Sequence, residues 1–305
     1  MNLDKLQAAM QKVEIHNYML TRDNETIAQG SFGKHTAEES PLVWSVSKSF
    51  MATAFGVARD EGLISLDDKL ADLFPQLTPP DAPDYARAIT MHDCLCMATG
   101  HFALPGHDIV NAPKLMRINP LLEYPPAYKP GTHFYYNSTA SYALGRAVSL
   151  KTGMRLLDYL KTKVLDKIGI TNTWWEQTAE GYDVGGSGLH VPIEGMSKLA
   201  LLYLNKGMWQ GERILSEDWV TKATSSQIDN RVAGWIETTE YRKDNGAGYG
   251  YQFWMGQHGT YRGDGAFGQF MIVFPQQRMT FCSTGYLING QPQRYLDDVY
   301  EAVLA

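Results

Sequence analysis

Ser45 and Lys48 are separated by two residues in the segment WSVSKSF, a spacing that suits nucleophilic catalysis. A serine hydroxyl is a weak nucleophile at neutral pH and needs a nearby base to accept its proton. On a helix, residues three apart lie on one face, so the lysine amine would stand next to the hydroxyl. Burial would lower the pKa of that amine toward the range of a working base. The pair therefore predicts that Ser45 is a nucleophile activated by Lys48.

The same S-x-x-K pattern also occurs at Ser31 and Lys34, so the pattern alone is weak evidence. That copy lies at a predicted strand end, where a spacing of three does not stack side chains. The copy at Ser45 opens a predicted helix, whose unpaired N–H groups point toward the serine. The Ser45 N–H can then stabilise an oxyanion. The competing interpretation is that Ser45 caps the helix and Lys48 is a surface lysine.

Gly263, Gly265 and Gly268, in RGDGAFGQFMIVF, fit the G-x-G-x-x-G pattern of dinucleotide-binding loops. That pattern requires a strand before the glycines and a helix after them. Here the apolar run QFMIVF follows and Pro275 ends it, which predicts a strand. We therefore expect no nucleotide site, and the glycines need another role.

The elements that must position these residues follow a simple order along the chain. Residues 13–33 alternate around a polar turn and predict a hairpin, further strand-like runs lie near the C-terminus, and helical periodicity dominates between them. We expect an α+β sandwich, with one antiparallel sheet built from residues 1–50 and 186–305 and flanked by helices. A mostly helical domain, residues 51–185, is expected to be inserted, with the active site at the interface.

Composition narrows the possible partners. A net charge of −6 over 305 residues, without a dense run of Lys or Arg, disfavours nucleic acid and anionic membranes. The chain lacks a signal-peptide pattern and a membrane-spanning window, so we expect a cytoplasmic protein. Cys94, Cys96 and Cys282 are expected to be buried, reduced thiols. No metal motif is present, and we expect His101 and His107 to be solvent-exposed in a Pro/Gly-rich loop and no metal to be bound.

The chain resembles the serine β-lactamase and penicillin-binding-protein superfamily, most closely its class C-like branch of esterases, peptidases and amidohydrolases. S-x-x-K is an element typical of that superfamily. The resemblance covers most of the chain and rests on an ordered series of segments: WSVSKSF, GLISLDDKLADLFP, ITMHDCLCMATGH, YPPAYKPGTHFYYNS, YALGRAV, GSGLHVPIEGMSKLALLYLNKGMWQGERILSEDWV and GDGAFGQFMIVFP.

This resemblance implies a catalytic tyrosine in a Tyr-x-Asn or Tyr-x-Ser element, and two tyrosines compete for the role. Tyr135 begins Tyr-x-Asn with Asn137, whereas Tyr136 begins Tyr-x-Ser with Ser138. The family's spacing from the preceding PG turn and to the glycine of the following LLG-like stretch favours Tyr136. By the resemblance, Tyr136 would shuttle a proton to the leaving group and then activate water, and Ser138 would orient Lys48.

The resemblance also implies that Gly263, Asp264 and Gly265 replace the Lys-Thr-Gly or His-x-Gly of a strand bordering the site. Glycine lets that strand approach a bound acyl group closely, and the Ala266 N–H would complete the oxyanion hole with that of Ser45. The usual Lys or His binds a substrate carboxylate. Its replacement by Gly263, with a negative charge added by Asp264, argues against efficient β-lactam binding.

Arg262 could replace the missing cation only if its side chain pointed into the site, and strand alternation places it on the opposite face from Gly263. Substrate contacts are expected from Trp44, Tyr135 and Asn137, together with the strand residues Gly263, Asp264 and Gly265. Other aromatic residues could line an apolar acyl pocket, although such residues are more often core: Trp175, Tyr251, Trp254 and Phe267.

We therefore expect a serine hydrolase that cleaves small esters or amides through an acyl-enzyme and needs no cofactor. The alternative within enzymes is a β-lactamase or D-alanyl-D-alanine carboxypeptidase. The alternative of another class is a non-catalytic ligand-binding protein on the same fold. No G-x-S-x-G elbow is present, which disfavours an α/β-hydrolase.

Overall fold

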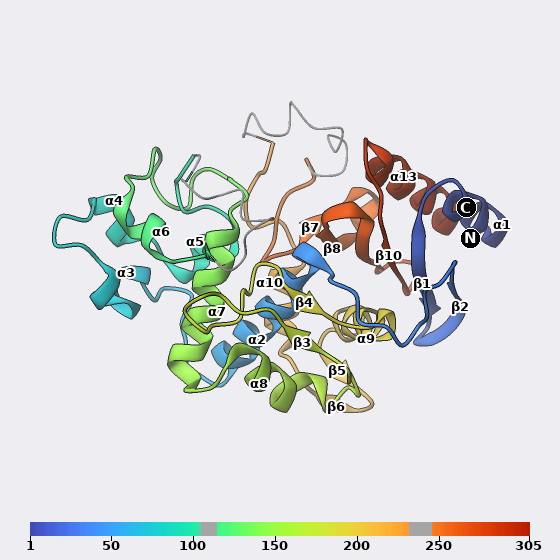
Figure 1. Ribbon diagram of the computed structural model, residues 1–305, viewed down its shortest axis with the longest axis horizontal. Helices are drawn as coiled ribbons and strands as arrows, with labels where there is room; N and C mark the ends of the chain where they lie inside the picture. Colours follow the sequence, from blue (N-terminus) through green and yellow to red (C-terminus); the bar gives the residue numbers. More distant parts are fainter. Residues whose placement is uncertain (103, 105–114, 232–245) are drawn as a thin grey trace.

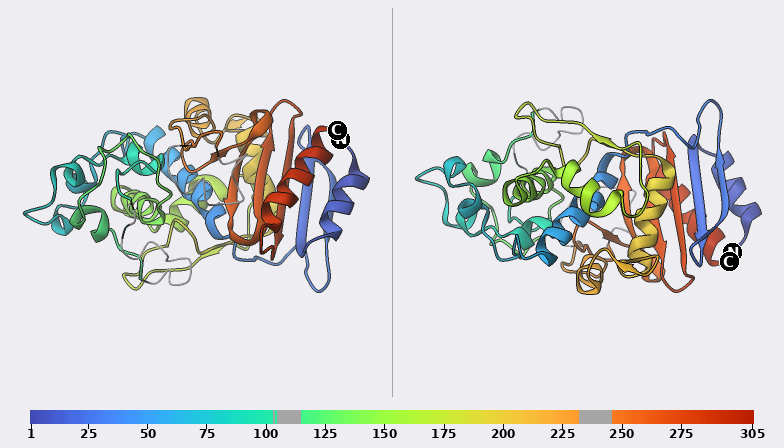
Figure 2. Two further views of the ribbon diagram at one scale, coloured as in Figure 1. Left: turned by 90° about the horizontal axis from the view of Figure 1, so that it is seen from above. Right: turned by 90° about the horizontal axis from the view of Figure 1, so that it is seen from below.

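The main sheet joins the two ends of the chain. The computed structural model describes residues 1–102, 104, 115–231 and 246–305. Its main sheet is antiparallel throughout, in the spatial order β2-β1-β10-β9-β8-β7. The six strands are β1 (Ile15–Arg22), β2 (Glu25–Ser31), β7 (Trp254–Met255), β8 (Tyr261–Gly265), β9 (Gln269–Phe274) and β10 (Met279–Gly285). The predicted sheet from both termini is thus confirmed, and the termini lie side by side (Figures 1 and 2).

The predicted N-terminal hairpin is also present. Strands β1 and β2 turn at Asp23 and Asn24, whose φ angles of 49° and 70° are those that a tight hairpin turn requires. β1 then runs beside β10, with Arg22 opposite Met279. The chain's first strand therefore lies inside the sheet, next to one of its last.

Helices cover both faces of this sheet. α1 (Leu3–Gln11) and α13 (Gln291–Leu304) lie on one face, and α9 (Ile193–Leu204) lies on the other (Figure 2). Buried side chains of α1 and α13 form one apolar cluster with alternate residues of the strands, such as Phe270 and Ile272. The opposite residues, such as Met271 and Val273, belong to the larger core that includes α9. Successive side chains of β9 point to opposite faces of the sheet, so the strand contributes to two cores, one on each face.

A group of helices lies beyond the sheet, at the opposite end of the molecule from the termini (Figure 1). The predicted break near Gly153 is confirmed, because Gly153 ends α7 with a φ of 69°. The helices of the group are α3 (Leu70–Leu73), α4 (Asp84–Ala88), α5 (Met91–Leu95), α6 (Asn119–Glu123), α7 (Ser138–Thr152) and α8 (Leu156–Leu160).

Two short strand pairs and the helix α10 (Glu217–Ala223) lie outside this group and outside the main sheet. The pairs are β3 (Trp174–Trp175) with β4 (Leu189–His190) and β5 (Met208–Trp209) with β6 (Glu212–Arg213).

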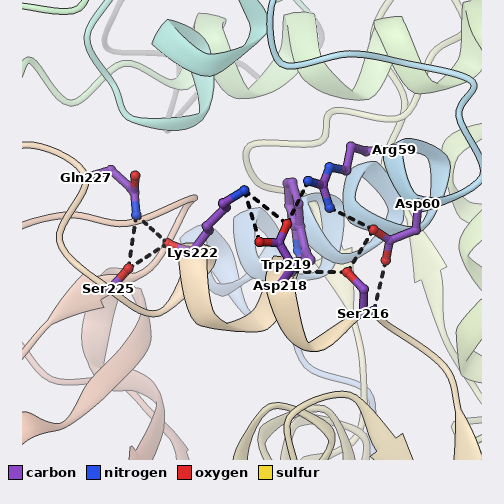
Figure 3. A network of polar contacts seen from close by, with 8 residues as sticks. All are labelled: Arg59, Asp60, Ser216, Asp218, Trp219, Lys222, Ser225 and Gln227. Atoms are coloured by element: carbon purple, nitrogen blue, oxygen red, sulfur yellow. Dashed lines mark hydrogen bonds and ion pairs between the residues drawn. The ribbon is translucent and has the colours of Figure 1, made fainter.

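Helix α2 (Ser47–Asp60) lies between these helices and the sheet. Its residues from Ser47 to Ala58 are all buried, and it packs against α7, α8 and β8. A polar network then holds its C-terminal end to α10: Arg59 pairs with Asp218 at 2.7 Å, and the Ser216 hydroxyl donates to Asp60 at 2.8 Å (Figure 3). The helix that follows the predicted nucleophile is therefore enclosed along its length and tied at its far end.

Two expectations about single residues have different outcomes. The three cysteines are free and buried, as predicted. His101 is wrongly predicted to be exposed: its side chain is enclosed, with ring nitrogens 3.1 Å from Thr99 Oγ1 and 3.0 Å from the Tyr124 carbonyl oxygen. His107 lies outside the described residues. Within the described parts of the chain, no helix is long and apolar enough to cross a membrane, and no cluster of His, Cys, Asp or Glu could hold a metal.

Candidate active site

Ser45 lies on a short 3₁₀ turn, Trp44–Val46, that leads directly into α2. The α-helix itself begins at Ser47, two residues later than the predicted helix start. The two side chains are nevertheless neighbours, as the S-x-x-K spacing predicts: Lys48 Nζ lies 3.0 Å from Ser45 Oγ. Trp44 holds a φ of 48°, an unusual angle for a residue with a side chain, of the kind found where a functional residue must be held in position.

Lys48 is enclosed by polar partners from distant parts of the chain. Its Nζ lies 3.1 Å from Ser138 Oγ, at the first residue of α7, and donates to the Gly186 carbonyl oxygen at 2.5 Å. Burial lowers the pKa of Lys48 to about 7, because desolvation disfavours the charged ammonium. A large fraction of the amine is therefore neutral at physiological pH and able to accept a proton.

Tyr136, not Tyr135, reaches the serine. The Tyr136 and Ser45 side chains are hydrogen-bonded, and Lys48 Nζ lies 4.9 Å from the centre of the Tyr136 ring. Burial raises the pKa of the Tyr136 hydroxyl above its usual value, so the tyrosine keeps its proton near neutral pH. The Tyr135 ring instead packs against Phe102, with ring centres 5.4 Å apart.

Asn137, expected to contact substrate, takes a different position. Its side chain is fully buried, and its Oδ1 accepts hydrogen bonds from the backbone N–H groups of Thr139 and Ala140. Asn137 is therefore the N-cap of α7, and no part of its side chain is exposed to a substrate. The cap fixes the start of the helix, and with it Ser138 beside Lys48.

The glycines of β8 allow the strand to approach the serine turn. A Cβ added at Gly263 would lie 2.9 Å from Ser49 Oγ, and one added at Gly265 would collide with the carbonyl oxygen of Val43. The Phe267 ring, just beyond the strand, packs edge-on against Trp44 with ring centres 5.2 Å apart. The backbone around Ala266 is thereby brought next to the turn that carries Ser45.

Arg262 and Asp264 are two residues apart on β8 and share one face of the strand. Arg262 is fully buried and donates through Nε to Asp264 Oδ2 at 2.9 Å. Trp254, opposite Arg262 in the sheet register, stacks on Tyr136 with ring centres 5.4 Å apart. Arg262 lies on the opposite face of β8 from Gly263, as predicted, and it is fully buried, so its side chain offers no surface to a substrate.

The remaining predicted aromatic residues divide into two groups. Trp44, Trp254 and Phe267 are within the contacts just described. Trp175 and Tyr251 are core residues: the indole of Trp175 donates to the Ser187 carbonyl, and Tyr251 packs on Trp219 away from Ser45.

Two residues of the site were missed by sequence reasoning. Gly186 contributes a backbone carbonyl, which leaves no signature in residue type. Gln252 is buried and joins three helices: its Oε1 accepts from Ser141 on α7 at 2.7 Å, its Nε2 donates to the Leu95 carbonyl on α5 at 2.9 Å, and its own carbonyl accepts from Ser49 on α2. A lone glutamine in a Gly- and Tyr-rich stretch carries no motif.

One family model covers nearly the whole chain. The family model described as Beta-lactamase matches residues 5–304. Lovastatin esterase from Penicillium rubens is 29% identical over 181 residues, which cover 51% of this chain and 44% of the esterase, so the match spans less than half of that relative.

Solved structures show the same fold across the whole chain. The octameric penicillin-binding protein homologue from Pyrococcus abyssi has a TM-score of 0.78 and 20% identity, covering 100% of this chain and 77% of that one. EstCE1, described as a hydrolase with promiscuous acyltransferase activity, has a TM-score of 0.77 and 16% identity, covering 99% and 98% of the two chains. At these identities the likeness establishes a β-lactamase and transpeptidase-like fold.

Proposed function

The chain belongs to the beta-lactamase family, and from this premise we propose that it is a serine hydrolase that cleaves small esters or amides through an acyl-enzyme at Ser45. The observation that carries the proposal is the contact between a buried lysine amine, with a pKa near 7, and the Ser45 hydroxyl at 3.0 Å. A base with a pKa near the working pH is the most effective proton acceptor for a weak nucleophile.

In the first half-reaction, Ser45 Oγ bonds to the carbonyl carbon of the substrate while Lys48 Nζ takes the serine proton. The backbone N–H groups of Ser45 and Ala266 donate to the oxyanion that forms. The bond from the acyl carbon to the leaving group then breaks, and Tyr136 delivers a proton to the departing oxygen or nitrogen. Its raised pKa supports this role, because the hydroxyl holds its proton until a stronger base develops beside it.

In the second half-reaction, water adds to the acyl carbon and gives a proton to the Tyr136 phenolate left by the first step. The ester bond to Ser45 breaks, protonated Lys48 returns its proton to Ser45 Oγ, and the carboxylic acid leaves. Ser138, 3.1 Å from Lys48 Nζ, keeps the amine directed at the serine through both steps.

Esters and amides are favoured over β-lactams as substrates because of the residues on β8. The partly exposed Asp264 carboxylate is beside Tyr136, and a side chain at Gly263 would meet Ser49, so the strand offers a substrate carboxylate little attraction. The similarity to lovastatin esterase supports the same preference.

The first experiment is intact-mass spectrometry after exposure to a fluorophosphonate probe. We expect a single adduct on the wild type, none on Ser45→Ala, and an unchanged adduct on Ser31→Ala, which removes the serine of the other S-x-x-K pattern. A screen of ester and amide substrates, with nitrocefin as the β-lactam, then identifies the reaction class. A folded wild type that forms no adduct would contradict the proposal and favour a ligand-binding protein on this fold.

A further inference from the structure

We propose that Asp264 makes this site prefer leaving groups that are cationic or neutral over leaving groups that are anionic. The inference rests on the serine-hydrolase function proposed above and names the part of the substrate that β8 selects. It concerns the alcohol, thiol or amine that departs, not the acyl group that stays on Ser45.

The position of Asp264 assigns it to the leaving-group end of the site. Its ion-pair partner Arg262 is opposite Trp254 in the sheet register, and Trp254 stacks on Tyr136 with ring centres 5.4 Å apart, which brings the Arg262–Asp264 pair to the side of the strand nearest Tyr136. The carboxylate also helps to raise the pKa of the Tyr136 hydroxyl. Tyr136 hydrogen-bonds Ser45 and is the group proposed to protonate the leaving atom. A leaving group that receives the Tyr136 proton must therefore lie near the Asp264 carboxylate as well.

The ion pair on β8 is uneven in its exposure. The Arg262 side chain is fully buried, whereas the Asp264 side chain is 13% exposed. A molecule that enters the site therefore meets the anionic partner, and the cation is behind it. In a partly desolvated site, a charge of this kind acts with an effective dielectric well below that of water.

The pair also has a structural role, because a buried guanidinium requires a counter-ion. An acidic residue is thus needed near Arg262 whether or not it affects substrates. A structural role alone predicts that folded Asp264→Asn keeps the wild-type ratio of rates for cationic and anionic leaving groups, and this difference separates the two interpretations.

The test uses three thioacetates that share one acyl group and differ in the released thiol. The thiols are thiocholine, its neutral isostere 3,3-dimethylbutanethiol, and 2-mercaptoethanesulfonate. Thiol release is followed with an aromatic disulfide reagent, and the buried cysteines of the protein give little background. We expect kcat/KM to fall in that order, with a ratio of cation to anion of at least about tenfold at low salt that shrinks as ionic strength rises.

Variants connect the preference to one carboxylate. Asp264→Asn is expected to lower the ratio of cation to anion toward the ratio for hydroxide-catalysed hydrolysis of the same two thioesters, and Asp264→Glu to retain most of the wild-type ratio. Asp67→Asn makes the same charge change at an exposed position and is expected to leave the ratio as in the wild type. If Asp264→Asn fails to fold because Arg262 loses its counter-ion, the double variant Arg262→Met with Asp264→Asn removes the whole ion pair, and the same fall in the ratio is expected there.

Equal rates for the three thioesters, faster cleavage of the anionic one, or cleavage of none while Ser45 still forms the fluorophosphonate adduct would overturn this inference and leave the serine-hydrolase proposal standing. Absence of both the adduct and thioester cleavage would overturn the two together.

Discussion

At the scale of single residues, the proposed chemistry depends on the ionisation of Lys48. The neutral amine is the form that accepts the serine proton, and burial lowers its pKa to about 7. We therefore expect kcat/KM for a neutral ester to rise about tenfold per pH unit below this value and to level off above it. A pH–rate profile from pH 5 to 9 measures both the rise in kcat/KM and the plateau. A profile that falls as pH rises through 7 would exclude Lys48 as the base.

The same pKa shift makes stability depend on pH. An unfolded lysine keeps its proton up to its ordinary pKa of 10.5, whereas folded Lys48 loses it near pH 7. Between these values the unfolded state binds more protons, so the wild type should gain stability with rising pH relative to Lys48→Met. We expect the difference in free energy of unfolding to change by up to about 4 kcal/mol from pH 7 to 10. Urea denaturation of both proteins tests the sign, and a difference that stays constant would contradict it.

Tyr136 and Tyr135 form a matched pair for mutation. Only Tyr136 is hydrogen-bonded to Ser45, so Tyr136→Phe should lower kcat by about 10²–10⁴-fold through loss of proton transfer. Tyr135→Phe removes the hydroxyl of the neighbouring tyrosine. It should change kcat by less than about threefold, since the Tyr135 ring packs on Phe102. Steady-state kinetics on an ester, with circular dichroism to confirm folding, distinguishes them. Equal effects would make the assignment of the catalytic tyrosine wrong.

At the scale of elements, strand β8 and the serine turn must remain in close contact. A methyl group at Gly265 would collide with the Val43 carbonyl and separate the two segments that carry the proposed oxyanion donors. We expect Gly265→Ala to lower kcat by about 10²–10³-fold, the range for loss of one such donor.

Gly145→Ala is the matched control for this substitution. Gly145 lies within α7, and its new methyl group would be 3.0 Å from the end of the flexible Leu156 side chain, with its other neighbours at ordinary contact distance. Its kcat should stay within about twofold of the wild type, because this contact can relax. An active Gly265→Ala would show that the close approach of β8 is not required for catalysis.

At the scale of the whole molecule, the sheet carries two cores, and only one of them supports the site. Leu296 of α13 is fully buried in the cluster between the terminal helices and the sheet, on the face away from α9. Leu296→Ala should lower the free energy of unfolding by about 2–4 kcal/mol through the cavity it leaves. Below the unfolding transition, kcat/KM should be unchanged.

Leu63→Ala, at a position where the side chain is 39% exposed, should cost less than about 1 kcal/mol. Chemical denaturation and ester kinetics on the two variants give both quantities. A loss of kcat/KM in folded Leu296→Ala would mean that the distal core affects the geometry of the site.

The sequence by itself determined the features that depend on neighbours along the chain. Periodicity predicted the hairpin, the break at Gly153 and the strand that follows the glycines, because helix and strand repeats involve residues a few positions apart. The same locality placed Lys48 beside Ser45. The preference for Tyr136 came from the family resemblance and its usual spacing, and the structure brings that side chain to the serine.

Only the tertiary structure decided which distant groups complete the site. The Gly186 carbonyl that accepts from Lys48 is 138 positions away, and a backbone oxygen has no signature in residue type. The burial of Asn137, His101 and Arg262 follows from how the helices and β8 pack. Such packing is a balance of many contacts between remote segments, and the pattern around any one residue does not contain it.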